Sequence, residues 1–79
     1  MKVTLYTRAG CHLCDEVKQV IEAVRLRIRF DYEEFDIDSE PQFRLLYNEE
    51  VPVILIDGRK AFKFRVTAAE LQKKLAARS

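Results

Sequence analysis

The residues whose types and spacing suggest chemistry are two cysteines, Cys11 and Cys14, in the segment Cys-His-Leu-Cys. A Cys-x-x-Cys pair beside a strand–helix unit is a signature of thiol–disulfide redox chemistry. The attacking species in that chemistry is a thiolate. A helix is expected to begin close to Cys11, and the unpaired N–H groups of its first turn favour a negative charge there. Cys11 is therefore the expected attacking thiol.

The neighbouring side chains suggest different roles for the two thiols. Arg8 and His12 can add positive potential beside Cys11 and so favour its thiolate. Cys14 lies one turn further along the helix, on the apolar stripe that includes Leu13. We therefore expect Cys14 to be the buried thiol that resolves a mixed disulfide formed on Cys11.

A structural disulfide, or two idle thiols, is one alternative use of this pair. A bridge that closes so short a loop stabilises a fold by only about 2 kcal/mol. Metal binding is a second alternative, but structural zinc needs four ligands and the chain has two cysteines and one histidine. His12 lies between the cysteines and is badly placed to bind the same ion, so we expect no metal without a second chain or an outside thiol.

Composition favours one small globular domain, 1–79, because 48% of the 79 residues are hydrophobic and 34% are charged. The formal net charge is +1, with basic and acidic residues mixed, so no nucleic-acid partner is expected. The longest apolar run, 51–56, is far shorter than the roughly 20 residues that span a bilayer, so no membrane association is expected. The lack of an apolar export segment and of spread-out cysteines favours a reducing, cytoplasmic location.

The apolar pattern predicts four strands and three helices. The helix start at Ser39 rests on Pro41 and Gln42, the hairpin on Asp57-Gly58, and the last helix on a Thr67/Glu70 capping box. The expected elements are a strand from Lys2 to Tyr6, a helix from near Cys11 to within 25–29, a strand ending near Ile37 with a bulge or a shifted start around 33–34, a helix capped by Ser39 and ending near Asn48, a buried strand at 53–56, a strand at 61–65 and a helix after Thr67.

This element order predicts an α/β protein, β-α-β-α-β-β-α, with a right-handed parallel crossover at its start. The hairpin would complete a mixed four-stranded sheet in the strand order 2-1-3-4, flanked by three helices. That is the layout of the minimal thioredoxin fold.

Pro52 interrupts an apolar run, and two explanations are open. A proline is permitted at the first residue of a strand. Alternatively, a cis Val51-Pro52 bond would present backbone groups beside the thiols. The spacing by itself does not decide between them.

The sequence resembles the glutaredoxins, and most closely the short glutaredoxin-like proteins that carry Gly-Cys-His-Leu-Cys. The resemblance implies that Cys11 is the nucleophile, that Cys14 is the resolving thiol and that Pro52 is a cis-proline opposite them. It also implies that the backbone of Val51 pairs with an extended segment of a substrate. The matching stretches are 5–16, Asp36-Ile37-Asp38, 51–54 and Asp57-Gly58.

The chain departs from the glutaredoxin pattern at three places. His12-Leu13 stands where a Pro-Tyr pair is typical, Glu50-Val51 stands where Thr-Val is usual, and 62–67 lacks the Gly-Gly and Asp that hold the γ-glutamyl end of glutathione. Arg8 and the helix start at Thr67 can still meet a glutathione carboxylate, whereas Glu50 would repel one. Glutathione recognition is therefore expected to carry over poorly.

The sequence thus predicts a monomeric dithiol–disulfide oxidoreductase with no bound cofactor. Its substrates would be protein or small-molecule disulfides, and its electron donor a reductase or glutathione. The alternatives are a dimer that shares an iron–sulfur cluster through Cys11, and a redox-inert interaction domain. The residues expected to contact a substrate are Arg8, His12, Leu13, Val51 and Pro52.

Overall fold

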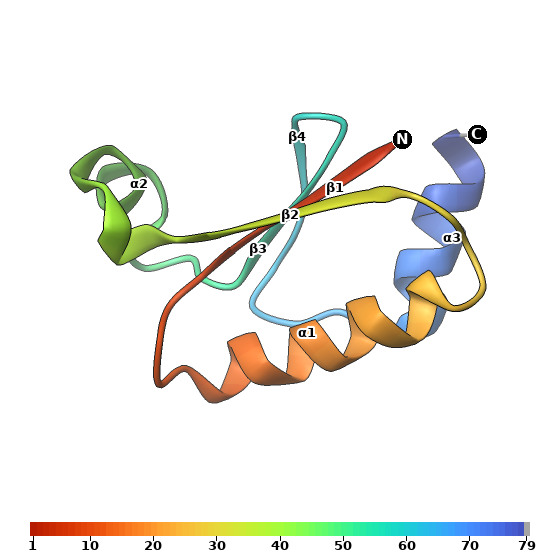
Figure 1. Cartoon of the computed structure of the whole chain (residues 1–79), viewed down its shortest axis with the longest axis horizontal. Coiled ribbons are helices and arrows are strands. Elements are labelled where there is room, and N and C mark those ends of the chain that lie inside the picture. Colours follow the sequence, from red (N-terminus) through yellow and green to blue (C-terminus); the bar gives the residue numbers. More distant parts are fainter. Residues whose placement is uncertain (79) are drawn as a thin grey trace.

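The computed structural model describes residues 1–78 and has a four-stranded mixed sheet with helices packed on it (Figure 1). The strand order is β2-β1-β3-β4; β1 is parallel to β2 and antiparallel to β3, and β3 and β4 form a hairpin. This order is the predicted one. The elements are β1 (Lys2–Thr7), α1 (His12–Arg25), β2 (Asp31–Asp36), the 3-10 turn η1 (Ile37–Ser39), α2 (Pro41–Tyr47), β3 (Val53–Ile56), β4 (Arg59–Lys63) and α3 (Ala68–Arg78).

The main core lies between the sheet and the pair of helices α1 and α3, which share one side of the sheet (Figure 1). Alternate residues of β1 and β3 point to this side, as the period of two in a strand requires. Each large apolar side chain that is fully buried there contributes roughly 1.5–3 kcal/mol to the stability of the fold. This packing holds α1 beneath β1, with the start of α1 at the carboxyl end of the strand. The buried members are Val3, Leu5, Val17, Ile21, Val24, Phe30, Ile54, Ile56, Val66, Leu71 and Leu75.

The short helix α2 is attached to the sheet by aromatic side chains instead. The ring of Tyr6 in β1 stacks on Tyr47 at a centroid distance of 4.4 Å and on Phe35 at 5.5 Å, and meets the edge of Phe43 at 5.2 Å. No residue of α2 is fully buried, and Leu45 is 88% exposed. Four rings therefore hold in place a helix that contributes little to the main core.

Two local signals in the sequence are confirmed. Glu70 N–H donates to the Thr67 hydroxyl at 3.1 Å and Thr67 N–H donates to the Glu70 carboxylate at 2.9 Å, which is the predicted capping box. Asp57 and Gly58 both have positive φ, 50° and 82°, as the tight turn of a two-residue hairpin requires.

The predicted cap at Ser39 is wrong. Ser39 ends the η1 turn, and its hydroxyl donates to the Asp36 carbonyl oxygen at 2.6 Å. Because α2 begins at Pro41, the N-cap position falls on Glu40, which makes no side-chain cap bond.

The second strand has no bulge against its neighbour. Its register with β1 runs without a break from Lys2↔Asp31 to Thr7↔Asp36. Tyr32 packs against the main core and Phe35 stacks on Tyr6, so the change of phase comes from apolar side chains on opposite faces of one unbroken strand. The hairpin strand β4 begins two residues earlier than the predicted 61–65, because the turn closes directly after Gly58. No helix in the described part of the chain has the length and apolar character needed to cross a membrane.

Candidate functional site

Cys11 occupies the N-cap position of α1, directly after the turn that leaves β1. Its backbone is extended, with φ −95° and ψ 115°, and its sulfur accepts a hydrogen bond from the Cys14 N–H at 3.2 Å. This bond satisfies one of the N–H groups that the first helical turn leaves without a partner. The Cys11 sulfur thus lies at the N-terminal end of α1, where the helix dipole is positive. The sulfur belongs to a half-buried residue.

Cys14 lies one turn into α1 and is completely buried. Burial raises the pKa of the Cys14 thiol above its ordinary value, and the adjacent Cys11 raises it further. The Thr7 side chain and the Arg8 backbone lower this pKa in part. Both thiols are free. The structure therefore provides one accessible thiol and one buried, protonated thiol.

Thr7 is a residue that the sequence pattern did not single out. Its hydroxyl is buried at the carboxyl end of β1, and it has no hydrogen-bond partner among residues 1–78. It lies near enough to the Cys14 sulfur to act on the pKa of that thiol, but not in hydrogen-bond geometry with it. A threonine at the end of a strand usually signals only β-propensity, so nothing in the sequence pattern pointed to it.

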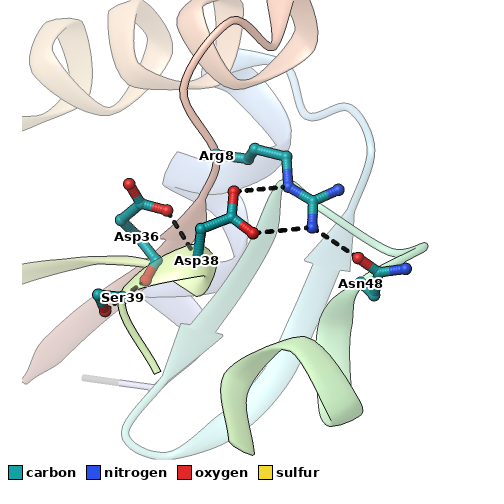
Figure 2. A network of polar contacts seen from close by, with 5 residues as sticks. All are labelled: Arg8, Asp36, Asp38, Ser39 and Asn48. Atoms are coloured by element: carbon teal, nitrogen blue, oxygen red, sulfur yellow. Dashed lines mark hydrogen bonds and ion pairs between the residues drawn. The ribbon is translucent and has the colours of Figure 1, made fainter. Parts of the chain in front are cut away.

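Arg8 does not extend freely toward the thiols. Its guanidinium donates to both carboxylate oxygens of Asp38, at 3.0 and 3.2 Å, and to the side-chain oxygen of Asn48 (Figure 2). Asp38 is itself held by its N–H, which donates to the Asp36 carboxylate at 2.8 Å. Arg8 thus ties the loop before Cys11 to the η1 turn and to the end of α2. Asp38 belongs to a stretch that carried the resemblance, but its partner could not be read from the sequence.

The Val51-Pro52 peptide bond is cis, which confirms that prediction. Pro52 is buried and Val51 is half-buried. Val53, the first residue of β3, pairs with Tyr6 near the carboxyl end of β1. Val51 and Pro52 therefore lie at the end of the sheet where the chain leaves β1 toward Cys11. His12 is exposed on the first turn of α1. Contact of Val51, Pro52 and His12 with a substrate stays a prediction.

Glu50, which was expected to repel an anionic ligand, is paired with lysines. Its carboxylate accepts from Lys60 Nζ at 2.7 Å and lies 4.0 Å from Lys63 Nζ. The hydrogen bond from Lys60, with the charges of both lysines, lowers the pKa of Glu50. The two cations are therefore already engaged by a carboxylate of the chain itself. Within residues 1–78, no cluster of three or more His, Cys, Asp or Glu side chains is arranged to hold a metal ion.

Solved structures share this arrangement of strands and helices. A protein from X. campestris has a TM-score of 0.81 and 29% sequence identity, covering 95% of this chain and 96% of that one. Fasciola hepatica thioredoxin has a TM-score of 0.69 at 18% identity, covering 99% of this chain and 80% of that one, which shows a shared fold. The chain therefore has the thioredoxin fold, with its strand and helix order as predicted.

Sequence comparison defines the family more closely. The chain belongs to the glutaredoxin-like domain family (DUF836), which it matches over residues 2–76. A glutaredoxin-like protein of Dictyostelium discoideum is 36% identical over 90% of this chain and 71% of that protein. A protein of Mycobacterium tuberculosis is 30% identical over 95% of this chain and 82% of that protein. The resemblance to glutaredoxin-like proteins is thereby confirmed.

The two thiols should be labelled in a fixed order by an alkylating reagent such as iodoacetamide. Cys11 is the more accessible thiol, whereas Cys14 is buried and its pKa is raised, so its thiolate forms only above the ordinary value of about 8.5. We expect the first adduct on Cys11 at pH 7, with labelling of Cys14 increasing only as the pH rises above about 8.5. Mass spectrometry of quenched samples gives both rates, and urea-unfolded protein is the control in which the rates converge. First labelling on Cys14 would contradict this assignment.

Proposed function

We propose that the chain is a dithiol–disulfide oxidoreductase in which Cys11 attacks and Cys14 resolves. The observation that carries the proposal is the difference between the two thiols. The Cys11 sulfur accepts an N–H bond at the start of α1 on a half-buried residue, whereas Cys14 is fully buried one turn further on. An attacking thiolate must reach solvent, and a resolving thiol needs only to reach the first sulfur. Membership of the glutaredoxin-like family supports the same chemistry.

The reaction proceeds by two sulfur exchanges. The Cys11 thiolate attacks one sulfur of a substrate disulfide, so that a Cys11–substrate disulfide forms and the other substrate sulfur leaves as a thiolate. Cys14 loses its proton, and its sulfur attacks the Cys11 sulfur. The second substrate sulfur leaves as a thiolate, and both leaving groups take up protons. The substrate gains two electrons, and the Cys11–Cys14 pair becomes a disulfide that an outside donor reduces again.

The proposed substrate contacts lie at the edge of the sheet where Cys11 is found. The Val51 backbone, ahead of the cis Pro52, would pair with an extended segment of the substrate, and His12 and Leu13 would contact it from α1. Val51 and Leu13 are half-buried and His12 is exposed, so each has surface to offer. In this scheme Arg8 positions the loop before Cys11, because its guanidinium is bound by Asp38 and Asn48.

Cys11→Ser and Cys14→Ser should behave differently. Cys11→Ser removes the nucleophile and should abolish reduction of a disulfide substrate. Cys14→Ser should still attack but then stall as a mixed disulfide, because no second thiol resolves it. Mass spectrometry after reaction with a peptide disulfide shows the trapped adduct. A trapped adduct in Cys11→Ser, with none in Cys14→Ser, would reverse the assignment, and no reaction of the wild type would indicate a redox-inert domain.

The electron donor is proposed to be a protein reductase rather than glutathione. Glutathione is small, so its binding rests on a few charged contacts. Two of the cations near the site are already paired: Arg8 with Asp38, and Lys60 with Glu50. To bind Arg8 or Lys60, glutathione would have to displace one of these carboxylates, whereas a protein donor can use a larger area of contact.

Oxidised protein should be reduced slowly by glutathione at cytosolic concentration and quickly by a flavoenzyme of the thioredoxin-reductase type. Asp38→Ala should increase the glutathione rate, because it releases the Arg8 guanidinium to bind a carboxylate. The matched control is Asp31→Ala, which removes an equal charge at the start of β2. Free-thiol appearance measures both rates. Fast, saturable reduction of the wild type by glutathione would contradict the proposal.

A further inference from the structure

The outer face of α2 exposes two adjacent leucines. Leu45 is 88% exposed and Leu46 is 62% exposed, and no residue of this helix is fully buried. Two open hollows, of about 440 and 380 Å³, share Leu45 as part of their walls. Single exposed leucines are common on protein surfaces, whereas neighbouring ones beside a hollow point to contact with another molecule. None of the roles proposed above uses this face.

The packing of α2 turns Leu45 directly away from the sheet. Phe43 and Tyr47 are one helical turn apart, and both pack against the ring of Tyr6 in β1. Leu45 is two residues from each of them, which is about 200° around the helix, so it projects from the opposite face. The rings therefore fix the inner face of α2, and Leu45 lies at the centre of its outer face. A face that is fixed in this way loses little conformational freedom when it binds.

Two charged side chains of opposite sign flank Leu45. Arg44 and Glu49 are exposed, and neither forms an ion pair with another residue of the described segment 1–78. The chain keeps its helical direction after α2, because Asn48 has φ −50° and ψ −39°. At about 100° per residue, Arg44 lies on one side of Leu45 and Glu49 on the other. Both also line the 380 Å³ hollow, together with Leu45 and Leu46.

This arrangement is complementary to itself. A two-fold axis through Leu45 lays the α2 helices of two copies antiparallel, with their Leu45 side chains in contact. The rotation moves Arg44 of each copy to the side on which the other copy has Glu49. The aliphatic stem of Arg44 then covers Leu46 of the other copy, while its guanidinium reaches the carboxylate. One cation and one anion favour neither an acidic nor a basic partner, so the best match for this face is a second copy.

We propose that two copies of the chain associate through this face of α2 as a symmetric dimer. The helix has seven residues and is about 10 Å long, so the contact is smaller than that of a permanent dimer, and the association is weak and reversible. The sheet lies between α2 and α1, so Cys11 of both copies stays accessible (Figure 1). The proposal departs from the monomer that the sequence predicts, and it holds whether or not the thiols are redox-active.

Sedimentation equilibrium from about 10 μM to about 1 mM protein measures this association. A phosphine reductant keeps both cysteines as thiols, so an intermolecular disulfide cannot account for a dimer. The average mass is expected to rise with concentration toward that of two chains. Leu45→Asp should raise the dissociation constant at least about tenfold, because it places a charge at the centre of the contact. The matched control is Leu26→Asp, which changes a leucine that is 89% exposed at the end of α1 and should leave the constant unchanged.

Charge reversal tests the two-fold arrangement itself. Arg44→Glu and Glu49→Arg each set like charges opposite one another, so each alone should raise the dissociation constant about fivefold or more. The double variant exchanges the two charges and should return the constant to within about twofold of the wild type. An equimolar mixture of the two single variants should also associate, because every facing pair in the mixed dimer then has opposite charges. Far-UV circular dichroism confirms that each variant keeps its fold.

Three results would overturn the dimer through α2. A wild type that stays monomeric at about 1 mM would show that this face does not bind a second copy and would leave it to a different protein. A dimer that Leu45→Asp leaves intact would place the contact elsewhere on the molecule. Association that is lost in Leu45→Asp, but recovered neither in the double charge variant nor in the mixture, would contradict the two-fold arrangement.

Discussion

The hydrogen bond from the Cys14 N–H to the Cys11 sulfur is the contact on which the rest of the site depends. It exists because α1 begins immediately after Cys11, and α1 begins there because its apolar stripe packs against β1 and β3. The same packing places Cys14 on the buried side of the helix. One helix position therefore sets the hydrogen bond to one thiol and the burial of the other. A shift of the helix start by one residue would remove both properties together.

Near the thiols, two cations are paired within the chain, and apolar surface is left exposed. Arg8 is held by Asp38, and Lys60 by Glu50, so neither cation is presented singly to an anionic ligand. Exposed pairs of this kind contribute little to stability, about 0–1 kcal/mol each, so their main effect is on what the site can bind. The apolar side chains of Leu13 and Phe64, in contrast, remain partly exposed to solvent. Recognition through area rather than charge is consistent with a protein substrate.

The sequence predicted the fold because its signals were local and agreed with one another: alternation in β1, a helical stripe from Cys14 to Val24, and the Thr67 capping box. It also predicted which thiol is buried, since Cys14 shares the helical stripe. It could not predict the partners of Arg8, because Asp38 lies 30 residues away and only the fold brings them together. The positive φ of Phe64 was missed for the same reason, since nothing local indicates it at a phenylalanine. The cap at Ser39 failed because Ser39 ends the preceding η1 turn, so that the N-cap of α2 is Glu40.

The most direct test of the dithiol mechanism is a redox titration of the Cys11–Cys14 pair. Protein is equilibrated in buffers of reduced and oxidised dithiothreitol or glutathione at pH 7, quenched with an alkylating reagent and weighed by mass spectrometry. A redox-active pair should show a single two-electron transition to an intramolecular disulfide, with about 30 mV for each tenfold change in the ratio of reduced to oxidised protein and a midpoint between about −120 and −270 mV. Cys14→Ser should show no such transition. A pair that never forms the disulfide, or one that stays oxidised below about −300 mV as structural bridges do, would contradict it.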